Sequence, residues 1–197
     1  MKIATKTLAG IIVLAALVVV LDYTMRYSGL KIPFPWFPVL KFDFTGIPIV
    51  LSLLLYGLVP GAFTSAIAVL AILARSGNIV SSLMKGLAEF STVVGMFLGL
   101  KMASKLSLPA TYFLGVLTRV TIMTIANLAL IYMGLLTFGD TLLIFVLLAG
   151  IFNVIQGTIS IVCGYLIYAA VKKRVPALTE EEHQNIRIAE RFVLKYL

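Results

Sequence analysis

Long apolar stretches with almost no charged residues dominate this sequence. One uncharged stretch, residues 44–74, would measure about 46 Å as one helix, well beyond the ~30 Å hydrocarbon core of a membrane, so we expect a turn at residues 57–61. Hydrophobic residues make up 61% of the chain and charged residues 12%, against roughly 45–50% and about 25% in soluble proteins. These values exclude a water-soluble globular domain and a disordered chain. They indicate a helical membrane protein that crosses the bilayer several times.

We expect an all-α membrane protein with six transmembrane helices. The helices are predicted at about residues 5–22, 44–57, 61–74, 80–100, 109–134 and 141–171. Pro60 and Gly61 are expected to break the chain between the second and third helices, and the proline- and aromatic-rich residues 23–42 to form a long loop. Residues 1–174 would then form one transmembrane domain, and residues 175–197 a tail with an amphipathic helix.

The basic residues predict the orientation of the chain. Six crossings place both termini on one side, together with Lys2, Lys6, Lys101, Lys105, Lys172, Lys173, Arg174, Arg187, Arg191 and Lys195. The opposite side would hold only Arg26, Lys31, Lys41 and Arg75. Because cytoplasmic loops carry the excess of Lys and Arg, we expect cytoplasmic termini and an outer loop at residues 23–42. The net charge of +8 therefore indicates orientation and not a nucleic-acid partner.

Motifs for common chemistries are absent from the sequence. There is no G-x-x-x-x-G-K-[ST] pattern, so the chain is not itself an ATPase. The single histidine, His183, lies in the tail, which argues against a zinc site within the membrane, and the single cysteine, Cys163, permits no internal disulfide. We therefore expect no catalytic residues, no metal and no resident cofactor.

Two charged residues fall inside the fourth predicted helix. Lys85 and Glu89 are four residues apart, so they share one face. Charges in a membrane are costly unless they face protein or water. Two interpretations stay open: an internal ion pair that holds the helix to its neighbours, or a contact to a bound ligand.

Side-chain amides mark the last two predicted helices. Asn127 lies in the fifth helix, and Asn153 and Gln156 share a face of the sixth. Such groups either bond neighbouring helices together or line a site for a neutral, planar ligand with a polar edge, because an amide both donates and accepts hydrogen bonds. The two amides in one helical turn favour the ligand site.

The predicted outer loop and the small residues also carry hypotheses. Trp36 rests at the lipid headgroups or belongs to a lid over a ligand. Asp43 is predicted to cap the following helix. Small residues four apart, as in Gly95/Gly99 and Ala62/Ala66, allow helices to approach closely, either within the protein or against a partner.

Three stretches resemble a known family of membrane proteins. They are LKFDFTGIP at residues 40–48, TIMTIAN at residues 121–127 and FNVIQG at residues 152–157. Their order and spacing resemble the substrate-binding S components of energy-coupling-factor (ECF) transporters, with most similarity to the riboflavin-binding branch. The resemblance implies a multi-pass protein of the prokaryotic plasma membrane. It would bind a vitamin near its outer face beneath a lid, and work with a transmembrane coupling subunit and two ATPase subunits.

The resemblance also assigns roles to residues of this chain. It implies that Asn153 and Gln156 meet the polar edge of a flavin-like ring with help from Asn127, and that Lys41 and Asp43 frame the hinge of the lid.

Some positions depart from the pattern of that branch. Gln156 stands where the branch has lysine, and Lys85 lies near a position that tends to be asparagine. The first helix lacks a clean Ala-x-x-x-Ala pair for the coupling subunit, and Ala62 and Ala66 are expected to serve instead.

Three hypotheses for function follow. The chain binds riboflavin or a close flavin for uptake, with Asn153, Gln156, Asn127, Lys85, Glu89, Lys41, Asp43 and Trp36 as candidate substrate-binding residues. Alternatively, it binds a different vitamin or vitamin precursor, or it is a membrane protein with no role in transport.

Overall fold

The computed structural model describes residues 5–102, 108–135 and 142–175. Over these residues the chain forms six helices and one two-stranded hairpin. In chain order they are α1 (Thr5–Tyr27), β1 (Ile32–Phe34), β2 (Phe37–Phe42), α2 (Gly46–Tyr56), α3 (Leu58–Ser76), α4 (Ile79–Met102), α5 (Leu108–Tyr132) and α6 (Leu142–Arg174). The described helices confirm the number and order of the predicted helical segments.

Five of these helices are long and apolar enough to cross a membrane, and α2 is not. With 11 residues, α2 is about 16 Å long, roughly half of the hydrocarbon core. It packs against α1, α3, α4 and α6, and all of residues 48–55 are buried. A helix that is apolar on every side is stable only when it is surrounded. The uncharged sequence of α2 therefore places it at the centre of the bundle.

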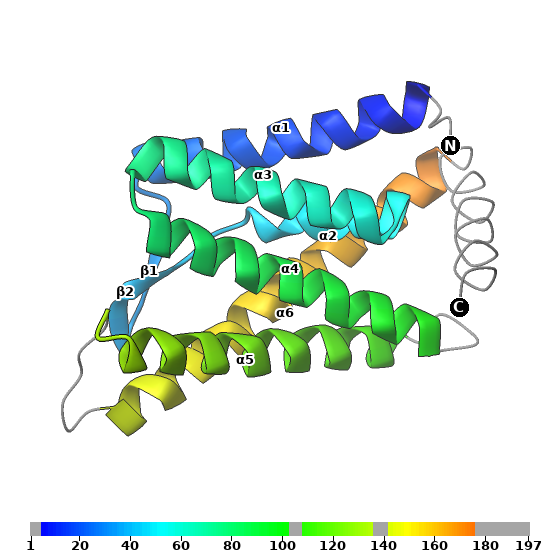
Figure 1. Cartoon of the computed structure of the whole chain (residues 1–197). Helices are drawn as coiled ribbons and strands as arrows, with labels where there is room; N and C mark the ends of the chain where they lie inside the picture. Colours follow the sequence, from blue (N-terminus) through cyan, green and yellow to red (C-terminus); the bar gives the residue numbers. More distant parts are fainter. Residues whose placement is uncertain (1–4, 103–107, 136–141, 176–197) are drawn as a thin grey trace, which may run out of the picture.

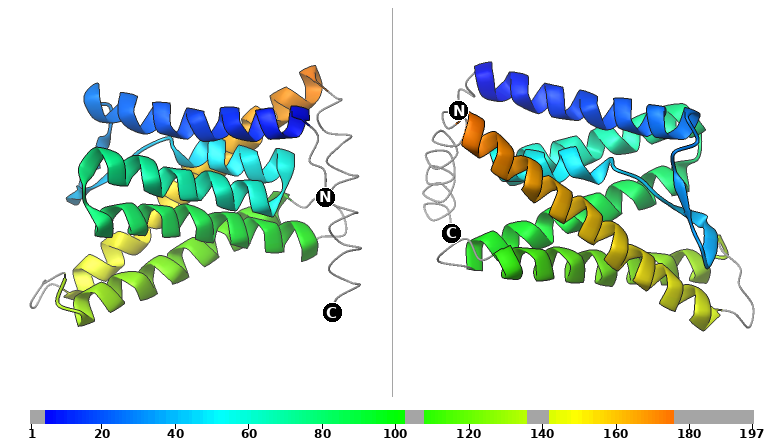
Figure 2. Two further views of the ribbon diagram at one scale, coloured as in Figure 1. Left: turned by 45° about the horizontal axis from the view of Figure 1, so that its top comes forward. Right: turned by 180° about the vertical axis from the view of Figure 1, so that it is seen from behind.

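The two ends of the bundle differ. The start of α1, the end of α4 and the end of α6 lie at one end, and the hairpin lies at the other (Figure 1). The two further views show α6 running obliquely across the bundle between these ends (Figure 2). Which end faces the cytoplasm remains a prediction from the basic residues. The predicted tail helix and His183 lie outside the described residues.

The turn between α2 and α3 falls at the first residue of the turn predicted at residues 57–61. Gly57 has φ +92°, a backbone conformation that L side chains rarely adopt, and it alone separates the two helices. Pro60 and Gly61 lie instead in the first turn of α3. A proline fits there because the first N–H groups of a helix need no intrahelical partner.

The segment at residues 23–42 corrects the prediction of a loop in an all-α protein. α1 continues to Tyr27, and β1 and β2 form an antiparallel hairpin in which Phe34 pairs with Phe37. Pro35 and Trp36 form its turn. Prolines are tolerated in such strands because each strand of a two-stranded sheet has a free edge.

Glycines allow α4 and α5 to lie in direct contact, as the spacing of Gly95 and Gly99 predicts. A Cβ on Gly99 would lie 2.6 Å from Cα of Thr111, which is main chain and cannot move aside by rotating. The close approach of the two helices therefore depends on the absence of a side chain at this position.

We expect Gly99→Ala to destabilise the protein by about 1–3 kcal/mol, because the added methyl group would push α4 and α5 apart. Gly150→Ala is the matched control, since a Cβ there has no neighbour within 4 Å and alanine favours a helix. Thermal unfolding of the purified variants in detergent measures the difference. Equal melting temperatures for the two variants would contradict the proposed close contact.

Candidate functional site

Four charged side chains meet inside the bundle. Lys85 Nζ lies 2.8 Å from Asp43 Oδ1 and 2.7 Å from Glu89 Oε1. Arg119 Nη1 lies 3.2 Å from the same Glu89 oxygen. Glu89 and Arg119 are buried, and the four charges sum to zero. The shared face of Lys85 and Glu89 is thereby confirmed as an internal ion pair, and a role of the two residues in ligand binding stays a prediction.

Arg119 holds the network together from α5. Its Nη1 donates to Thr92 Oγ1 at 3.0 Å, and its Nε donates to Asn153 Oδ1 at 3.2 Å. The guanidinium therefore joins α4, α5 and α6. Spreading the donors over several acceptors is what allows a charged side chain to remain buried.

Arg119 is not among the predicted site residues, although the spacing along α5 carries a signal for it. The buried residues of α5 recur every four positions, as Thr111, Gly115, Arg119, Met123 and Asn127. This spacing places Arg119 on the same face as Asn127. Asn127 itself is buried on that face, two turns beyond Arg119.

The two amides of α6 are buried on one face, as predicted, and they are hydrogen-bonded within the protein. Gln156 Nε2 donates to the main-chain oxygen of Asp43 at 2.7 Å, and its Oε1 accepts from the Asp43 N–H at 3.3 Å. Asn153 donates to the Ala149 carbonyl in addition to accepting from Arg119. The donor and acceptor of Gln156 are thus both paired with the chain's own main chain.

Asp43 does not cap α2, which corrects the sequence prediction. The N-cap of α2 is Thr45, without a side-chain cap bond. Asp43 Oδ1 instead accepts from Lys85 Nζ and, at 2.7 Å, from Thr45 Oγ1. Burial raises the pKa of Asp43, but the ammonium of Lys85, the Thr45 hydroxyl and Lys31 together lower it more, so the pKa lies below its usual value. Asp43 Oδ1 also accepts from the Thr45 N–H at 3.2 Å, so the carboxylate lies just before α2 and bonds the N-cap residue itself.

The hairpin covers the first half of α6 with aromatic rings. Phe42 stacks on Phe152 with centroids 4.9 Å apart, and Phe34, fully buried, meets Phe152 edge-on. Trp36 at the turn is 66% exposed and contacts Phe34. Lys41 is exposed on β2, so the structure does not bring it into the charged network. The hairpin rests on the helix that carries the amides, and its role as a lid stays a prediction.

A second ionic cluster joins the base of the hairpin to the bundle. Asp22 of α1 is 1% exposed and accepts from Lys31 at 2.5 Å and from Arg75 of α3 at 2.6 Å. Lys31 also lies 4.0 Å from Asp43 Oδ2. The sequence did not predict this cluster. The sign of it in the sequence is a single acidic residue, Asp22, at the end of an apolar stretch.

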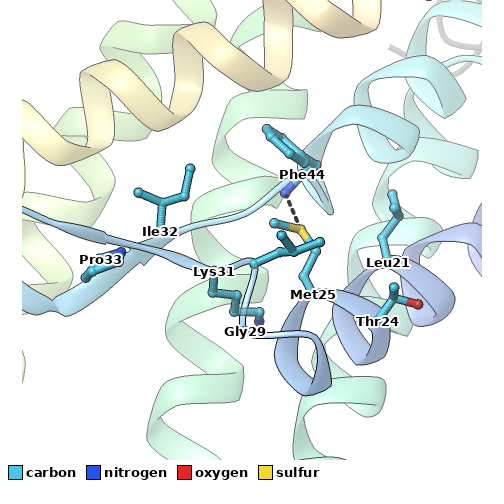
Figure 3. A pocket seen from close by; sticks show the side chains of 9 residues that line it. Leu21, Thr24, Met25, Gly29, Lys31, Ile32, Pro33 and Phe44 are labelled. Carbon is cyan, nitrogen blue, oxygen red and sulfur yellow. Dashed lines mark hydrogen bonds between the residues drawn. The ribbon is translucent and has the colours of Figure 1, made fainter.

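A groove of about 480 Å³ lies beside this cluster. Leu21 and Met25 of α1, Lys31 and Phe44 are among the residues that line it (Figure 3). The Phe44 N–H donates to Met25 Sδ at 3.3 Å across it. The groove is almost entirely apolar, and the amides of α6 do not line it.

The predicted docking residues, Ala62 and Ala66, lie on the face of α3 that points away from the bundle. Ala66 is exposed and Ala62 half-buried, beside the exposed Phe63 and Leu70. Their role in docking stays a prediction.

Comparison with known proteins identifies the fold. No family model matches the sequence, and no curated protein matches it. A solved structure of the S component of a bacterial ECF transporter is similar to this chain, with a TM-score of 0.73 and 22% sequence identity, over 86% of this chain and 97% of that one. The chain therefore has the fold of an ECF S component.

We expect Arg119→Gln to destabilise the protein by about 3–5 kcal/mol, because it removes the charge that balances buried Glu89. Arg26→Gln is the control, since Arg26 is exposed at the end of α1 and its loss should change stability by less than about 0.5 kcal/mol. Thermal unfolding in detergent compares the two. If both variants melt together, the network does not support the fold.

Proposed function

We propose that the protein is the substrate-binding S component of an ECF transporter and takes up riboflavin or a close flavin across a prokaryotic plasma membrane. One observation carries the proposal: Phe152 and Gln156 lie one turn apart on α6 under the aromatic hairpin. Together they offer a ring surface and an amide that both donates and accepts. A flavin has a flat ring with adjacent carbonyl and N–H groups on its edge, which matches this pair.

The hairpin itself occupies this surface in the structure. Phe42 stacks on Phe152, and the Asp43 main chain pairs with Gln156. A flavin that binds here takes over both contacts, so residues 42–43 move aside as it enters. The ligand-binding form is then the one in which the hairpin has shifted and closed again over the ring.

In this proposed role the protein binds its ligand and catalyses no reaction. A coupling subunit in the membrane and two ATPase subunits would supply the energy, since the chain has no nucleotide-binding motif of its own. Ala62 and Ala66 are the proposed contact to the coupling subunit, because small side chains on an exposed helix allow another helix to approach closely.

A second candidate is an S component for another vitamin. Lys85, Glu89 and Gln156 support it, because they depart from the residues of the riboflavin branch and the Lys85 ammonium offers a partner to an anionic ligand. Competition with a panel of vitamins distinguishes the two candidates.

We expect the purified protein to bind riboflavin with saturable quenching of Trp36, the only tryptophan of the chain. Gln156→Ala should weaken binding by about 1–3 kcal/mol, a factor of about 5 to 150, because it removes a buried hydrogen-bonding group. Thr158→Ala is the control, since Thr158 lies on the same helix and bonds Tyr112 instead. A co-purified flavin absorption band would support the proposal. Equal affinity of wild type and Gln156→Ala would overturn the assignment of the site.

The proposed displacement of residues 42–43 by the ligand can be tested separately. We expect Phe42→Ala to speed riboflavin association, because the ring that competes for Phe152 is gone. Phe37→Ala is the control, since Phe37 packs on Phe145. Stopped-flow quenching measures both rates. If Phe42→Ala associates no faster than Phe37→Ala, the ligand does not replace Phe42.

A further inference from the structure

The ion pairs in the described part of the chain do not balance in charge. They form two clusters, which meet where Lys31 lies 4.0 Å from Asp43. The network around Arg119 is neutral, whereas the second cluster has one carboxylate, Asp22, for two cations, Lys31 and Arg75. It therefore holds one positive charge more than it pairs. Such a charge is costly in a membrane, so an anion beside it would stabilise the protein.

Lys31 brings this surplus charge to the groove of about 480 Å³. Its side chain is 13% exposed, and it is one of the residues that line the groove (Figure 3). An ammonium group has three N–H donors. Among the described residues, one of them is used in the hydrogen bond to Asp22. The remaining donors can bind an acceptor that enters the groove.

The rest of the groove is apolar and begins at the level of the lipid headgroups. Leu21 and Met25 of α1 belong to its wall. The helix ends at Tyr27, which is 76% exposed, and tyrosines of this kind sit at the boundary between membrane and water. Lys31 follows this end of the helix, whereas Leu21 precedes it by more than one turn. The groove thus has a positive charge at the boundary and an apolar wall toward the membrane interior.

This arrangement matches one class of molecule, an anionic phospholipid. Its phosphate would accept from Lys31 and supply the missing negative charge, and its acyl chain would cover the apolar wall. A zwitterionic lipid covers the wall but adds a positive charge of its own, and an inorganic anion leaves the wall uncovered. Basic pockets between transmembrane helices are known to bind anionic headgroups.

We propose that the groove between α1 and the hairpin binds one anionic phospholipid of the surrounding membrane, with its phosphate at Lys31 and an acyl chain along Leu21 and Met25. The residues that line the groove come from α1, from residues 29–33 and from Phe44, so the lipid contacts the helix and the base of the hairpin together. The amides of α6 do not line it. The site is therefore separate from the proposed flavin site and does not depend on the proposed function.

A lipid titration tests the role of the charge. Dioleoyl phosphatidylglycerol, which is anionic, and dioleoyl phosphatidylcholine, which is zwitterionic, have the same acyl chains. Native mass spectrometry of the delipidated protein in detergent measures the affinity for the first lipid molecule bound. We expect the anionic lipid to bind about 5-fold more tightly, the value of one lysine near a headgroup.

Lys31→Gln should abolish this preference and leave the affinity for phosphatidylcholine unchanged. The fold should be kept, because Arg75 still pairs with Asp22. Lys101→Gln is the matched control, since it removes the same charge from an exposed lysine at the end of the bundle opposite the hairpin. It should keep the preference of the wild type.

A second pair of variants tests the groove itself. Thr24 is exposed on α1 and lines the groove, so Thr24→Trp should fill it and weaken the binding of both lipids. Val13→Trp is the control, since Val13 is an exposed position of the same helix, about three turns away. It should change neither affinity.

Three results would overturn the proposal. The first is equal affinity of the wild type for the two lipids, and the second is an equal loss of preference in Lys31→Gln and Lys101→Gln, which would show a diffuse attraction to the whole surface. The third is unchanged lipid binding in Thr24→Trp, which would place the lipid outside the groove. None of these measurements uses a flavin, so a failure of the proposed function would leave them unaffected.

Discussion

The pairing of Arg119 with Glu89 is the interaction on which the rest of this structure depends. Both groups are buried, and neither would be stable there alone. Through Glu89 the pair fixes Lys85, and through Lys85 it fixes Asp43, which leads the chain from the hairpin into α2. The neutral network thereby connects the hairpin with three long helices. An apolar bundle in lipid has little else to specify which helix faces which.

The short α2 explains how a hairpin can reach so far into a membrane protein. α2 spans only part of the length of the bundle. The chain covers the remaining length with β2 and the residues between β2 and α2 (Figure 1). Main-chain groups outside helices need partners at this depth. Gln156 supplies two of them to Asp43. The same amide is therefore part of the fold and the strongest candidate for ligand binding.

The sequence predicted the helical segments well, because length and hydropathy decide them. It also predicted that Lys85 and Glu89 share a face, and that Asn153 and Gln156 do, since spacing along one helix is local information. It failed for contacts between distant segments. The link from Asp43 to Lys85, and the arginine that completes the network, depend on how elements pack in three dimensions. The hairpin was missed because its prolines are typical of loops, and only the free edges of a two-stranded sheet accommodate them.

The ion pairs at the base of the hairpin have a consequence for its movement. Asp22 is held by Lys31, which belongs to the hairpin segment, and also by Arg75, which belongs to α3. In the proposed opening of the hairpin, Lys31 would leave with it and Arg75 would stay behind. The aspartate therefore never stands without a counter-charge, and the largest electrostatic penalty of opening is avoided. The second cation would therefore let the hairpin move as proposed while the link between α1 and α3 is kept.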